Sequence, residues 1–337
     1  MVIPVEQVRE LARRALQRIG VPEGHARLQA DLLIEAELCG RPSHGLLRLN
    51  RVIERIRNGV TDPGALGKHR WRGAALLEVD GCRGLGPVVA CAALDQICAR
   101  AAETGIALAA ISNSNHLGML AWYAERVTAQ GFCVVALTTS EALVHPWGGR
   151  QALVGTNPIL IGIPASPEPF ILDMATSLVS MGQIHDYALQ ARELPRDWAL
   201  DAEGRPTTDP NAAKGGSIAP FGGAKGYALG LAFEVLVSSL TQAAIGPEVR
   251  GTLDSVEPCT KGDLFIVINT VAGSDASRRV AGYLQAIREC PPADGFSSVS
   301  VPGDRSRACR TQRLRDGLPL ADHVWQQLQT LSGSAQI

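Results

Sequence analysis

A short polar segment, Arg41-Pro-Ser-His-Gly-Leu-Leu-Arg48, combines a hydroxyl, an imidazole and a guanidinium group. Ser43 and His44 are neighbours, and the flanking proline and glycine favour a tight turn that presents both side chains. A histidine in such a turn can give or take a proton near neutral pH. Arg48 follows four residues after His44, and its planar fork of donors binds a carboxylate through two hydrogen bonds. This combination suits chemistry on a small 2-oxo or 2-hydroxy acid.

The same residues also have a purely structural interpretation. Ser43 can cap the next helix, with His44 in its first turn and Arg48 in a surface ion pair. The spacing matches no metal or catalytic-triad motif, so this segment alone leaves both interpretations open. A hydrolase built on Ser43 and His44 is disfavoured, because adjacent residues rarely face each other as nucleophile and base and the chain has no GxSxG elbow.

A second polar segment, Asn113-Ser-Asn-His-Leu-Gly118, follows an apolar run at 106–111 and precedes helix-like sequence. The carboxyl ends of strands in α/β proteins collect ligands, and a helix N-terminus attracts anions such as a pyrophosphate. A polar loop with a helix cap is the alternative. We favour a functional role, because His116 has little packing purpose among amide and hydroxyl side chains.

Three later segments contain glycines or hydroxyls in patterns typical of ligand-binding loops. Paired glycines precede a Gly155-Thr-Asn-Pro158 turn, which indicates backbone that approaches a ligand, or simply two tight turns. The hydroxyls and carboxylate of Asp173-Met-Ala-Thr-Ser177 can meet ribose or phosphate, or cap a helix. Glycines around Lys225 open an apolar helix and suggest a phosphate seat, although the Walker A spacing is absent.

The elements that must position these side chains begin with helices. Hydrophobic periodicity predicts helices over about 5–19 and 23–39, a third over 46–59, and a loop at 61–72. From 73 to 140 the pattern alternates strand, helix, strand, helix and strand, which is typical of an α/β fold. The first strand is followed by Gly81-Cys-Arg-Gly-Leu-Gly86, whose glycine order is GxxGxG and not the GxGxxG of a Rossmann domain.

The second half of the chain continues with mixed elements. The sequence predicts strands within 156–164 and 170–177, irregular structure at 201–222, and a mostly apolar, buried helix at 223–240. The remaining elements are predicted as a strand at 263–270, a helix at 278–290, a short strand at 298–303 and a final helix from about 318 to 331.

Composition excludes several classes of protein. The 337 residues suggest about two domains. A net charge of −1 and only 4% aromatic residues argue against nucleic acid as a partner. No apolar run approaches the roughly 18 residues of a membrane span, and the N-terminus does not resemble a secretory signal. The eight cysteines form no CxxC pair, so we expect no metal site and a reducing, cytoplasmic location.

Taken in order, these segments resemble the non-Rossmann malate/L-lactate dehydrogenase family, which includes ureidoglycolate and sulfolactate dehydrogenases, diketogulonate reductase and Δ1-piperideine-2-carboxylate reductases. The matching segments span 41–304 and are RPSHGLLRL, DGCRGLGPVVA, SNSNHLGMLAWYAE, PWGGRQALVGTNPI, LDMATS, DAEGRPTTDP, PFGGAKGYALGLAFE and VPGD. The resemblance implies NAD or NADP as cofactor. It also implies hydride transfer between nicotinamide and a small 2-hydroxy or 2-oxo acid of the malate, lactate or sulfolactate type.

The resemblance further implies an α/β fold whose nicotinamide-binding domain is a large mixed sheet flanked by helices, with a helical domain formed by both chain ends. We accordingly expect an N-terminal helical segment at 1–72, the cofactor-binding domain at 73–290, and a C-terminal segment at 291–337 that returns to the helical domain. A homodimer is expected, with a small carboxylic acid as substrate and neither nucleic acid nor membrane as partner.

Residue by residue, the resemblance assigns His44, Ser43 and His116 to catalysis. It assigns Arg48 and Thr156 to substrate binding. The expected cofactor contacts are His116, Ser140, Asp173, Ala175, Thr176, Lys225 and Asp304. Asp304 stands where the family has the glutamate of a Pro-Gly-Glu turn, and is one methylene shorter. We hypothesise His44 as the main acid/base, with His116 as its rival.

Two alternatives remain for the function. The first is a reductase of cyclic imino acids such as piperideine- or pyrroline-2-carboxylate. Some imine-reducing members carry an acidic residue where this chain has Gln183, and NADP-using ones often carry a histidine where it has Ala224. Both departures favour a 2-oxo acid. The second is a non-catalytic binding protein, which the retention of His44, Arg48 and Lys225 disfavours.

Overall fold

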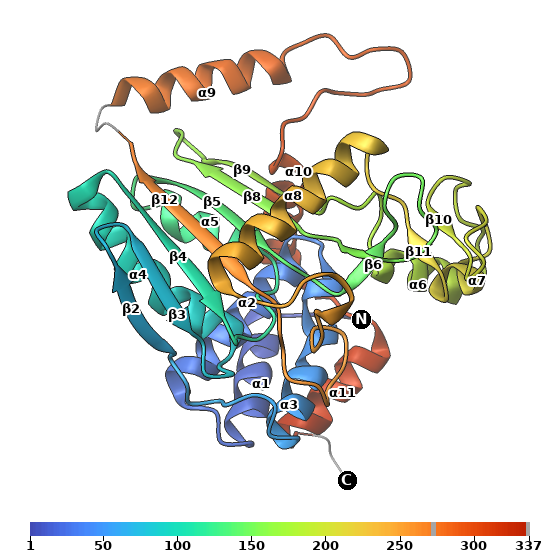
Figure 1. Ribbon diagram of the computed structural model, residues 1–337, viewed down its shortest axis with the longest axis horizontal. Helices are drawn as coiled ribbons and strands as arrows, with labels where there is room; N and C mark the ends of the chain where they lie inside the picture. Colours follow the sequence, from blue (N-terminus) through green and yellow to red (C-terminus); the bar gives the residue numbers. More distant parts are fainter. Residues whose placement is uncertain (271–273, 335–337) are drawn as a thin grey trace.

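A seven-stranded mixed sheet crosses the centre of the computed structural model, which describes residues 1–270 and 274–334 (Figure 1). The strand order is β2-β3-β4-β12-β5-β8-β9. These strands are β2 (Lys68–Arg72), β3 (Leu76–Asp80), β4 (Ile106–Ser112), β5 (Phe132–Thr138), β8 (Ile159–Ile163), β9 (Phe170–Met174) and β12 (Asp263–Asn269). Among the described strands of this sheet, only β3 and β4 pair in parallel, because a helix carries the chain across between them. The predicted large mixed sheet is confirmed.

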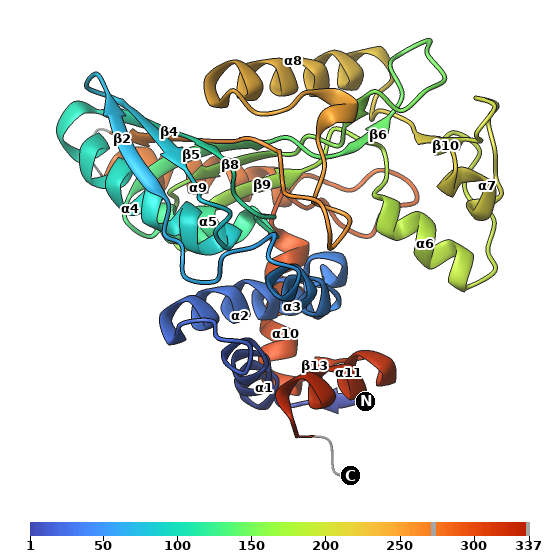
Figure 2. The same ribbon diagram turned by 60° about the horizontal axis from the view of Figure 1, so that its bottom comes forward.

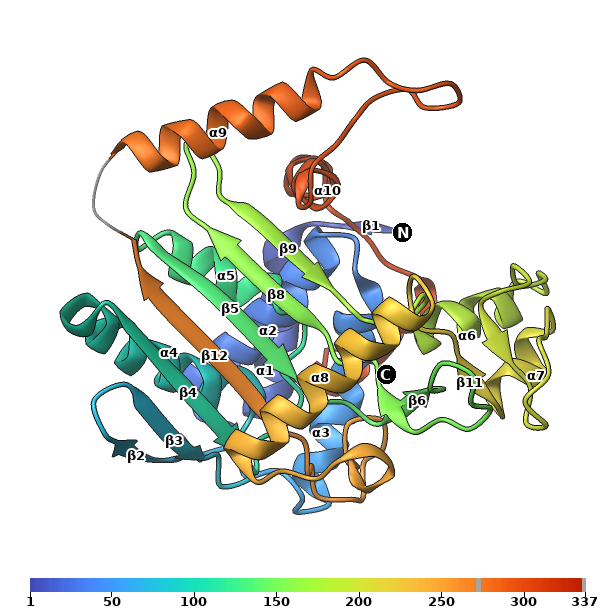
Figure 3. The same cartoon turned by 45° about the horizontal axis from the view of Figure 1, so that its top comes forward.

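Helices cover both faces of this sheet (Figures 2 and 3). On one face lie α4 (Gly86–Thr104) and α5 (Ala121–Thr128), and on the other lies α8 (Ala224–Thr241). Strand β12 illustrates how both faces of the sheet are buried, because its alternate side chains point to opposite faces. Its Phe265 and Val267 point into the core under α4 and α5, whereas Leu264 packs beside Val237 of α8.

A helical layer made from both ends of the chain packs against α4 and the sheet (Figure 2). It contains α1 (Val5–Gln17), α2 (Glu23–Leu38), α3 (Leu49–Arg57), α10 (Asp304–Asp316) and α11 (Asp322–Ser332). The chain ends also pair directly, because β1 (Val2–Ile3) is antiparallel to β13 (Leu318–Pro319). Leu16, Ile53 and Leu318 are fully buried in the core of this layer. The helical layer positions the segment that contains His44.

A small lobe extends from the end of the large sheet (Figure 1). Its four-stranded sheet has the order β10-β11-β6-β7. Its elements are β6 (Ala142–Val144), β7 (Val154–Gly155), α6 (Met181–Leu189), β10 (Ala199–Leu200), α7 (Pro210–Lys214) and β11 (Ser217–Ile218). The remaining elements are α9 (Ser274–Arg288) and the 3-10 turns η1 (Pro42–His44), η2 (Leu46–Arg48) and η3 (Gly246–Glu248). Among the described residues, no helix is both long and apolar enough to cross a membrane.

Several sequence-based predictions of local structure are wrong. The predicted loop at 61–72 contains the edge strand β2, whose polar sequence KHRWR hides the strand pattern, and whose Arg70 pairs with Glu78 of β3. The predicted strand at 298–303 is irregular, and the Val301 N–H is bound by the Asp304 carboxylate instead of a strand partner. The predicted irregular stretch 201–222 includes α7, because Asp209 caps a helix that starts at Pro210.

Candidate active site

Two histidines from distant parts of the chain stack against each other. His44 lies in the 3-10 turn η1, and His116 lies in the loop that follows β4. Their ring centroids are 5.8 Å apart and the rings are inclined by 25°. The Ser43 hydroxyl oxygen lies 3.0 Å from Nδ1 of His44. The structure therefore brings together the three residues predicted to be catalytic.

Hydrogen bonding distinguishes the two imidazole rings. The Gly118 N–H donates to Nδ1 of His116 at 3.1 Å, so that nitrogen is an acceptor. Neutral His116 accordingly carries its proton on Nε2. Nδ1 of His44 faces a hydroxyl group, which can either donate or accept, so both tautomers of His44 are compatible with its surroundings.

Arg48 is held beside this pair by two carbonyl groups. Its Nε donates to the Ser43 carbonyl at 2.9 Å, and its Nη1 donates to the Thr252 carbonyl at 3.4 Å. Nη2 makes no hydrogen bond with any described residue. The guanidinium group therefore keeps free donors, and binding of a carboxylate stays the predicted role of Arg48.

Glu37, which the sequence analysis did not single out, shapes the turn that carries His44 and Arg48. Its buried carboxylate accepts a hydrogen bond of 2.8 Å from the Leu46 N–H at the start of η2. Burial raises the pKa of Glu37, and this hydrogen bond with Arg313 nearby partly offsets the rise. A Cβ at Gly45 would overlap the Glu37 side chain, so glycine is required for this close approach.

A pocket joins the two histidines and Arg48. It is also lined by the polar residues Gln29, Arg51, Arg55, Thr61, Asn115 and Thr252. None of the residues that line this pocket has a carboxylate. The site is therefore cationic, which suits an anionic ligand.

Asn115, beside His116, is a second residue that the sequence analysis gave no separate role. Its buried Oδ1 accepts hydrogen bonds from Nε of Arg55 at 3.0 Å and from the Thr61 hydroxyl at 2.9 Å. Its Nδ2 donates to the Gly84 carbonyl at 2.9 Å. These bonds fix the loop that holds His116 against the helical layer.

The GxxGxG segment has a packing role next to this loop. A Cβ at Gly86 would overlap the His116 carbonyl oxygen, and one at Gly81 would lie 2.8 Å from the Asn113 carbonyl oxygen. The glycines thus let the start of α4 approach the loop of His116 closely. Close packing therefore explains the glycines of residues 81–86, and no Rossmann-type phosphate loop is needed to account for them.

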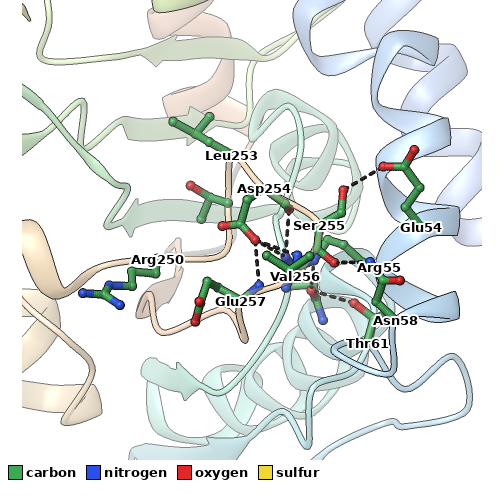
Figure 4. A network of polar contacts seen from close by, with 12 residues as sticks. Glu54, Arg55, Asn58, Thr61, Arg250, Leu253, Asp254, Ser255, Val256 and Glu257 are labelled. Atoms are coloured by element: carbon green, nitrogen blue, oxygen red, sulfur yellow. Dashed lines mark hydrogen bonds and ion pairs between the residues drawn. The ribbon is translucent and has the colours of Figure 1, made fainter. Parts of the chain in front are cut away.

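Residues 250–257, which we call the strap, lie beside α3 (Figure 4), and Gly251 and Thr252 of the strap line the pocket. The Glu141 carboxylate accepts hydrogen bonds of 2.8 Å from the N–H groups of Thr252 and Leu253. At the other end of the strap, the Asn58 side chain donates to the Ser255 carbonyl at 2.8 Å. The strap thus links the strand region after Ser140 to the helical layer and gives Arg48 its Thr252 contact.

The electrostatics of the pocket follow from burial among cations. Burial, with smaller contributions from the Arg48 and Arg41 guanidinium groups, lowers the pKa of His44 to about 4. Burial and then Arg48 hold the pKa of His116 well below its usual value. Burial, followed by repulsion from Arg51, lowers the pKa of Arg48 to about 10, so Arg48 stays charged at neutral pH. A bound anion would offset this positive field and raise the pKa of both histidines.

Ser140, Thr156 and Thr176 form a separate hydroxyl cluster. The hydroxyl groups of Ser140 and Thr156 are 3.0 Å apart, and the Thr176 hydroxyl donates to the Thr156 carbonyl at 3.0 Å. Ser140 directly precedes Glu141, so the cluster adjoins the strap that contacts Arg48. Three of the predicted ligand contacts are therefore brought together.

The carboxylates of Asp173 and Asp304 bind groups of the protein itself. The Asp173 carboxylate accepts a hydrogen bond of 2.8 Å from the Ala121 N–H at the start of α5, which is the capping alternative considered from the sequence. Asp304 pairs with Arg288 and Arg307 at 2.8 and 2.9 Å. Hydrogen bonding by Arg288 is the main reason why the pKa of Asp304 lies far below its usual range. Their cofactor roles stay predictions, as does that of half-buried Ala175.

Lys225 is exposed in the first turn of α8 and pairs with no described residue. No side chain caps the N-terminus of this helix, which starts after Gly223. The site therefore offers the free N–H groups of the first turn and the Lys225 ammonium group, and the helix dipole adds positive potential. These groups fit the pyrophosphate of a nicotinamide cofactor. No group of three or more His, Cys, Asp or Glu side chains within 1–270 and 274–334 could hold a metal ion.

Comparisons with known proteins agree with this geometry. A family model described as malate/L-lactate dehydrogenase matches residues 3–329. L-sulfolactate dehydrogenase of Methanocaldococcus jannaschii is 35% identical over 334 residues, which cover 98% of this chain and 96% of that protein. A Δ1-pyrroline-2-carboxylate/Δ1-piperideine-2-carboxylate reductase of Pseudomonas putida is 32% identical, covering 98% of this chain and 97% of that protein.

A solved structure of similar fold is a dehydrogenase from Sinorhizobium meliloti, with a TM-score of 0.94 and 48% identity over 98% of both chains. The match along nearly the whole length includes the large sheet and the helical layer. The chain therefore belongs to the malate/L-lactate dehydrogenase family, which confirms the prediction of an NAD(P)-dependent oxidoreductase of this type.

Proposed function

We propose that the chain catalyses the reversible, NAD(P)-dependent interconversion of a small 2-hydroxy acid and the corresponding 2-oxo acid. The observation that carries this proposal is one pocket that contains the His44–His116 pair and a charged Arg48 with free donors. Arg48 binds the substrate carboxylate and so orients the neighbouring carbon for reaction. The bound cofactor supplies or accepts the hydride.

His44 is the group that gives and takes the proton in this proposal. A group that carries a proton through the reaction must be stable both with and without it. Nδ1 of His44 faces the Ser43 hydroxyl, which can turn to accept from the imidazolium or donate to the neutral ring. Protonation of His116 would instead bring an Nδ1–H against the Gly118 N–H and lose a hydrogen bond.

His116 therefore acts as a neutral donor. Its Nε2–H can hydrogen-bond to the substrate oxygen and stabilise negative charge that develops there. Burial among arginines favours this neutral state. Ser43 is a relay neighbour that keeps His44 oriented, and Thr156 contributes a substrate contact from the hydroxyl cluster.

The cofactor would be held by residues outside the histidine pair. Lys225 and the N-terminus of α8 would hold phosphate groups, and the hydroxyls of Ser140 and Thr176 would contact the remainder. Ala175, Asp173 and Asp304 would line the cofactor site, the two carboxylates mainly by fixing α5 and α10.

Reduction of cyclic imino acids is the second candidate, and the similarity to the Pseudomonas putida reductase supports it. A protonated imine is a cation, however, and the pocket presents arginines and no carboxylate. Gly182 of the lobe approaches Ser43, and the residue after it is the neutral Gln183. These features favour a 2-oxo acid.

A spectrophotometric screen tests the proposal. Purified protein is mixed with NADH or NADPH and a panel of 2-oxo acids and cyclic imines, and loss of the reduced cofactor is recorded. We expect oxidation with at least one 2-oxo acid. If only cyclic imines are reduced, imine reduction replaces 2-oxo acid reduction as the proposed function. If no compound is reduced with either cofactor, the proposed oxidoreductase activity is refuted and a non-catalytic binding protein is favoured.

We also propose a cytoplasmic homodimer with the domain division at 72/73 and 290/291. All eight cysteines are free thiols, which supports a reducing compartment. Four apolar side chains of α8 are exposed, which supports burial against a second copy; they are Leu229, Leu231, Val235 and Leu236. Light scattering after gel filtration measures the number of subunits.

A further inference from the structure

A buried carboxylate in the middle of α8 has no cation beside it. Glu234 is 1% exposed, and it forms no ion pair with any residue that the structure describes. A carboxylate is rarely buried without a counterion unless hydrogen bonds replace the water that it has lost. The hydrogen-bond partners of Glu234 therefore indicate its role.

Three N–H groups from two separate loops bind this carboxylate. Its Oε2 accepts from the Gly155 N–H at 3.2 Å and from Nδ2 of Asn157 at 2.7 Å, and its Oε1 accepts from the Gly246 N–H. All three partners are donors, so the surroundings suit a group that only accepts, which is an ionised carboxylate. Glu234 thus ties α8 to the Gly155–Asn157 turn.

Asn157 connects this carboxylate to the hydroxyl cluster. It is fully buried, and its Nδ2 also donates to the Gly230 carbonyl at 3.1 Å, whereas its Oδ1 accepts from the Ser140 N–H at 3.2 Å. A side-chain amide can be turned over, which exchanges the places of its oxygen and nitrogen. Because two acceptors lie on the Nδ2 side, only the orientation that points Oδ1 at Ser140 satisfies every group.

The backbone of the turn is shaped for this connection. Asn157 has a φ of 27°, in the left-handed region that favours glycine. A Cβ at Gly155 would overlap Oδ1 of Asn157 and the Ser140 carbonyl oxygen, and a Cβ at Gly230 would lie 2.7 Å from the Thr176 hydroxyl oxygen. Backbone of this kind persists where the surrounding structure fixes it, and it gathers at ligand sites. The turn, α8 and the hydroxyl cluster therefore form one closely packed unit.

The cluster contains hydroxyl groups that are predicted to contact ligands. The Thr156 N–H donates to Oγ of Ser140 at 2.8 Å, and the two hydroxyl oxygens are 3.0 Å apart. The hydrogen bond between the two hydroxyls uses one of their protons, so the other stays available for a ligand. Its direction depends on where the backbones of Ser140 and Thr156 lie, and Asn157 binds the first and directly follows the second.

We propose that Glu234 is a positioning residue of the active site, which acts through Asn157 to orient the hydroxyls of Ser140 and Thr156 toward cofactor and substrate. This inference rests on the proposed function. It adds a residue that does not line the pocket of the two histidines.

Glu234→Gln tests the proposal, because it keeps the size of the side chain but sets an NH2 group against N–H donors. The Asn157 amide then loses its fixed orientation. With the best 2-oxo acid of the screen, we expect kcat/KM to fall about tenfold, mainly through KM, since the Thr156 contact is made with bound substrate. The Kd of the reduced cofactor, measured by nicotinamide fluorescence, should rise about threefold through Ser140.

A double-mutant cycle with Thr156→Val separates positioning from a general structural role. Thr156→Val removes the hydroxyl itself. If Glu234 acts through that hydroxyl, adding Glu234→Gln to Thr156→Val should lower kcat/KM by less than about twofold more at saturating cofactor. Effects that multiply in the double variant of an active enzyme would overturn the positioning role and leave the proposed function intact.

Ser238→Ala is the matched control on α8. The Ser238 hydroxyl donates to the Ala244 carbonyl at 3.2 Å, close to the Gly246 loop that Glu234 also binds, and it makes no contact with the hydroxyl cluster. This variant should lower the melting temperature and leave KM and the cofactor Kd unchanged. A KM that rises equally in Ser238→Ala and Glu234→Gln would overturn the positioning role.

Two further arms keep the test decisive. If Glu234→Gln does not fold, Asn157→Ser replaces it in the cycle, because it removes the amide and leaves the carboxylate bound to Gly155 and Gly246. If the wild type reduces no 2-oxo acid, the proposed function is lost. The cofactor Kd still tests Glu234 in that case, and an unchanged Kd in Glu234→Gln would overturn its positioning role as well.

Discussion

Replacement of Arg48 should separate carboxylate binding from the rest of catalysis. In the structure its Nε is held by the Ser43 carbonyl at 2.9 Å, which leaves Nη2 and one N–H of Nη1 for a bidentate carboxylate. Each charge-assisted hydrogen bond contributes about 1.5–3 kcal/mol. Arg48→Met removes both, so we expect kcat/KM to fall by about 10²- to 10⁴-fold. Arg48→Lys keeps the charge without the fork and should lose about 10- to 100-fold.

The assay is the initial rate of NADH or NADPH oxidation at saturating cofactor, with the best 2-oxo acid of the screen. Cofactor affinity, measured by nicotinamide fluorescence, should stay within about twofold of the wild type, because the hydrogen bonds of Arg48 go to Ser43 and Thr252 and to no predicted cofactor residue. Arg57→Met, on the exposed side of α3, controls for loss of a positive charge on this helix. If Arg48→Met retained kcat/KM within about threefold of the wild type, Arg48 would not bind the carboxylate.

Three further predictions concern the support of the site. Gly45→Ala places a Cβ against Glu37, so the free energy of unfolding in a denaturant titration should fall by about 1–3 kcal/mol, and an unchanged midpoint would refute this contact. The pKa of His44 is about 4 in the folded protein, against an ordinary value of about 6.5 for histidine. Between these two values the unfolded chain binds more protons than the folded protein does, so stability falls as the pH decreases through them. Between pH 7 and pH 5 the free energy of unfolding should therefore decrease by about 2 kcal/mol less in His44→Asn than in the wild type. An equal decrease in both proteins would contradict the lowered pKa. Lys225→Met should raise the Kd of the reduced cofactor about tenfold in a fluorescence titration, whereas an unchanged Kd would place Lys225 outside the cofactor site.

The candidate residues could be singled out from the sequence because they lie within short polar segments, although residue types alone left a structural interpretation of His44 and Arg48 open. His44 and Arg48 share one turn, and His116 interrupts an α/β rhythm at the carboxyl end of a strand. That the two segments meet could not be read from spacing, since 72 residues and several elements separate the histidines. Family resemblance supplied that expectation.

Residues that act through long-range contacts were missed. Glu141 binds Thr252 across 111 positions, and β12 inserts between β4 and β5, which no local pattern indicates. Glu37 did leave a signal in the sequence, a charged residue on a helix face whose other positions are buried and apolar. Asn115 stood within the segment that contains His116, but its role depends on Arg55, sixty positions away.

The proton path through His44 is the central claim, and the two histidines can be compared directly. Single-turnover reduction of bound 2-oxo acid is measured with His44→Asn and His116→Asn at saturating cofactor and substrate. If His44 carries the proton, His44→Asn loses about 10²- to 10⁴-fold in rate and the pH dependence of the chemical step, whereas His116→Asn keeps that pH dependence at a reduced rate. Near-full activity of His44→Asn, together with loss of activity and of the pH profile in His116→Asn, would contradict this account.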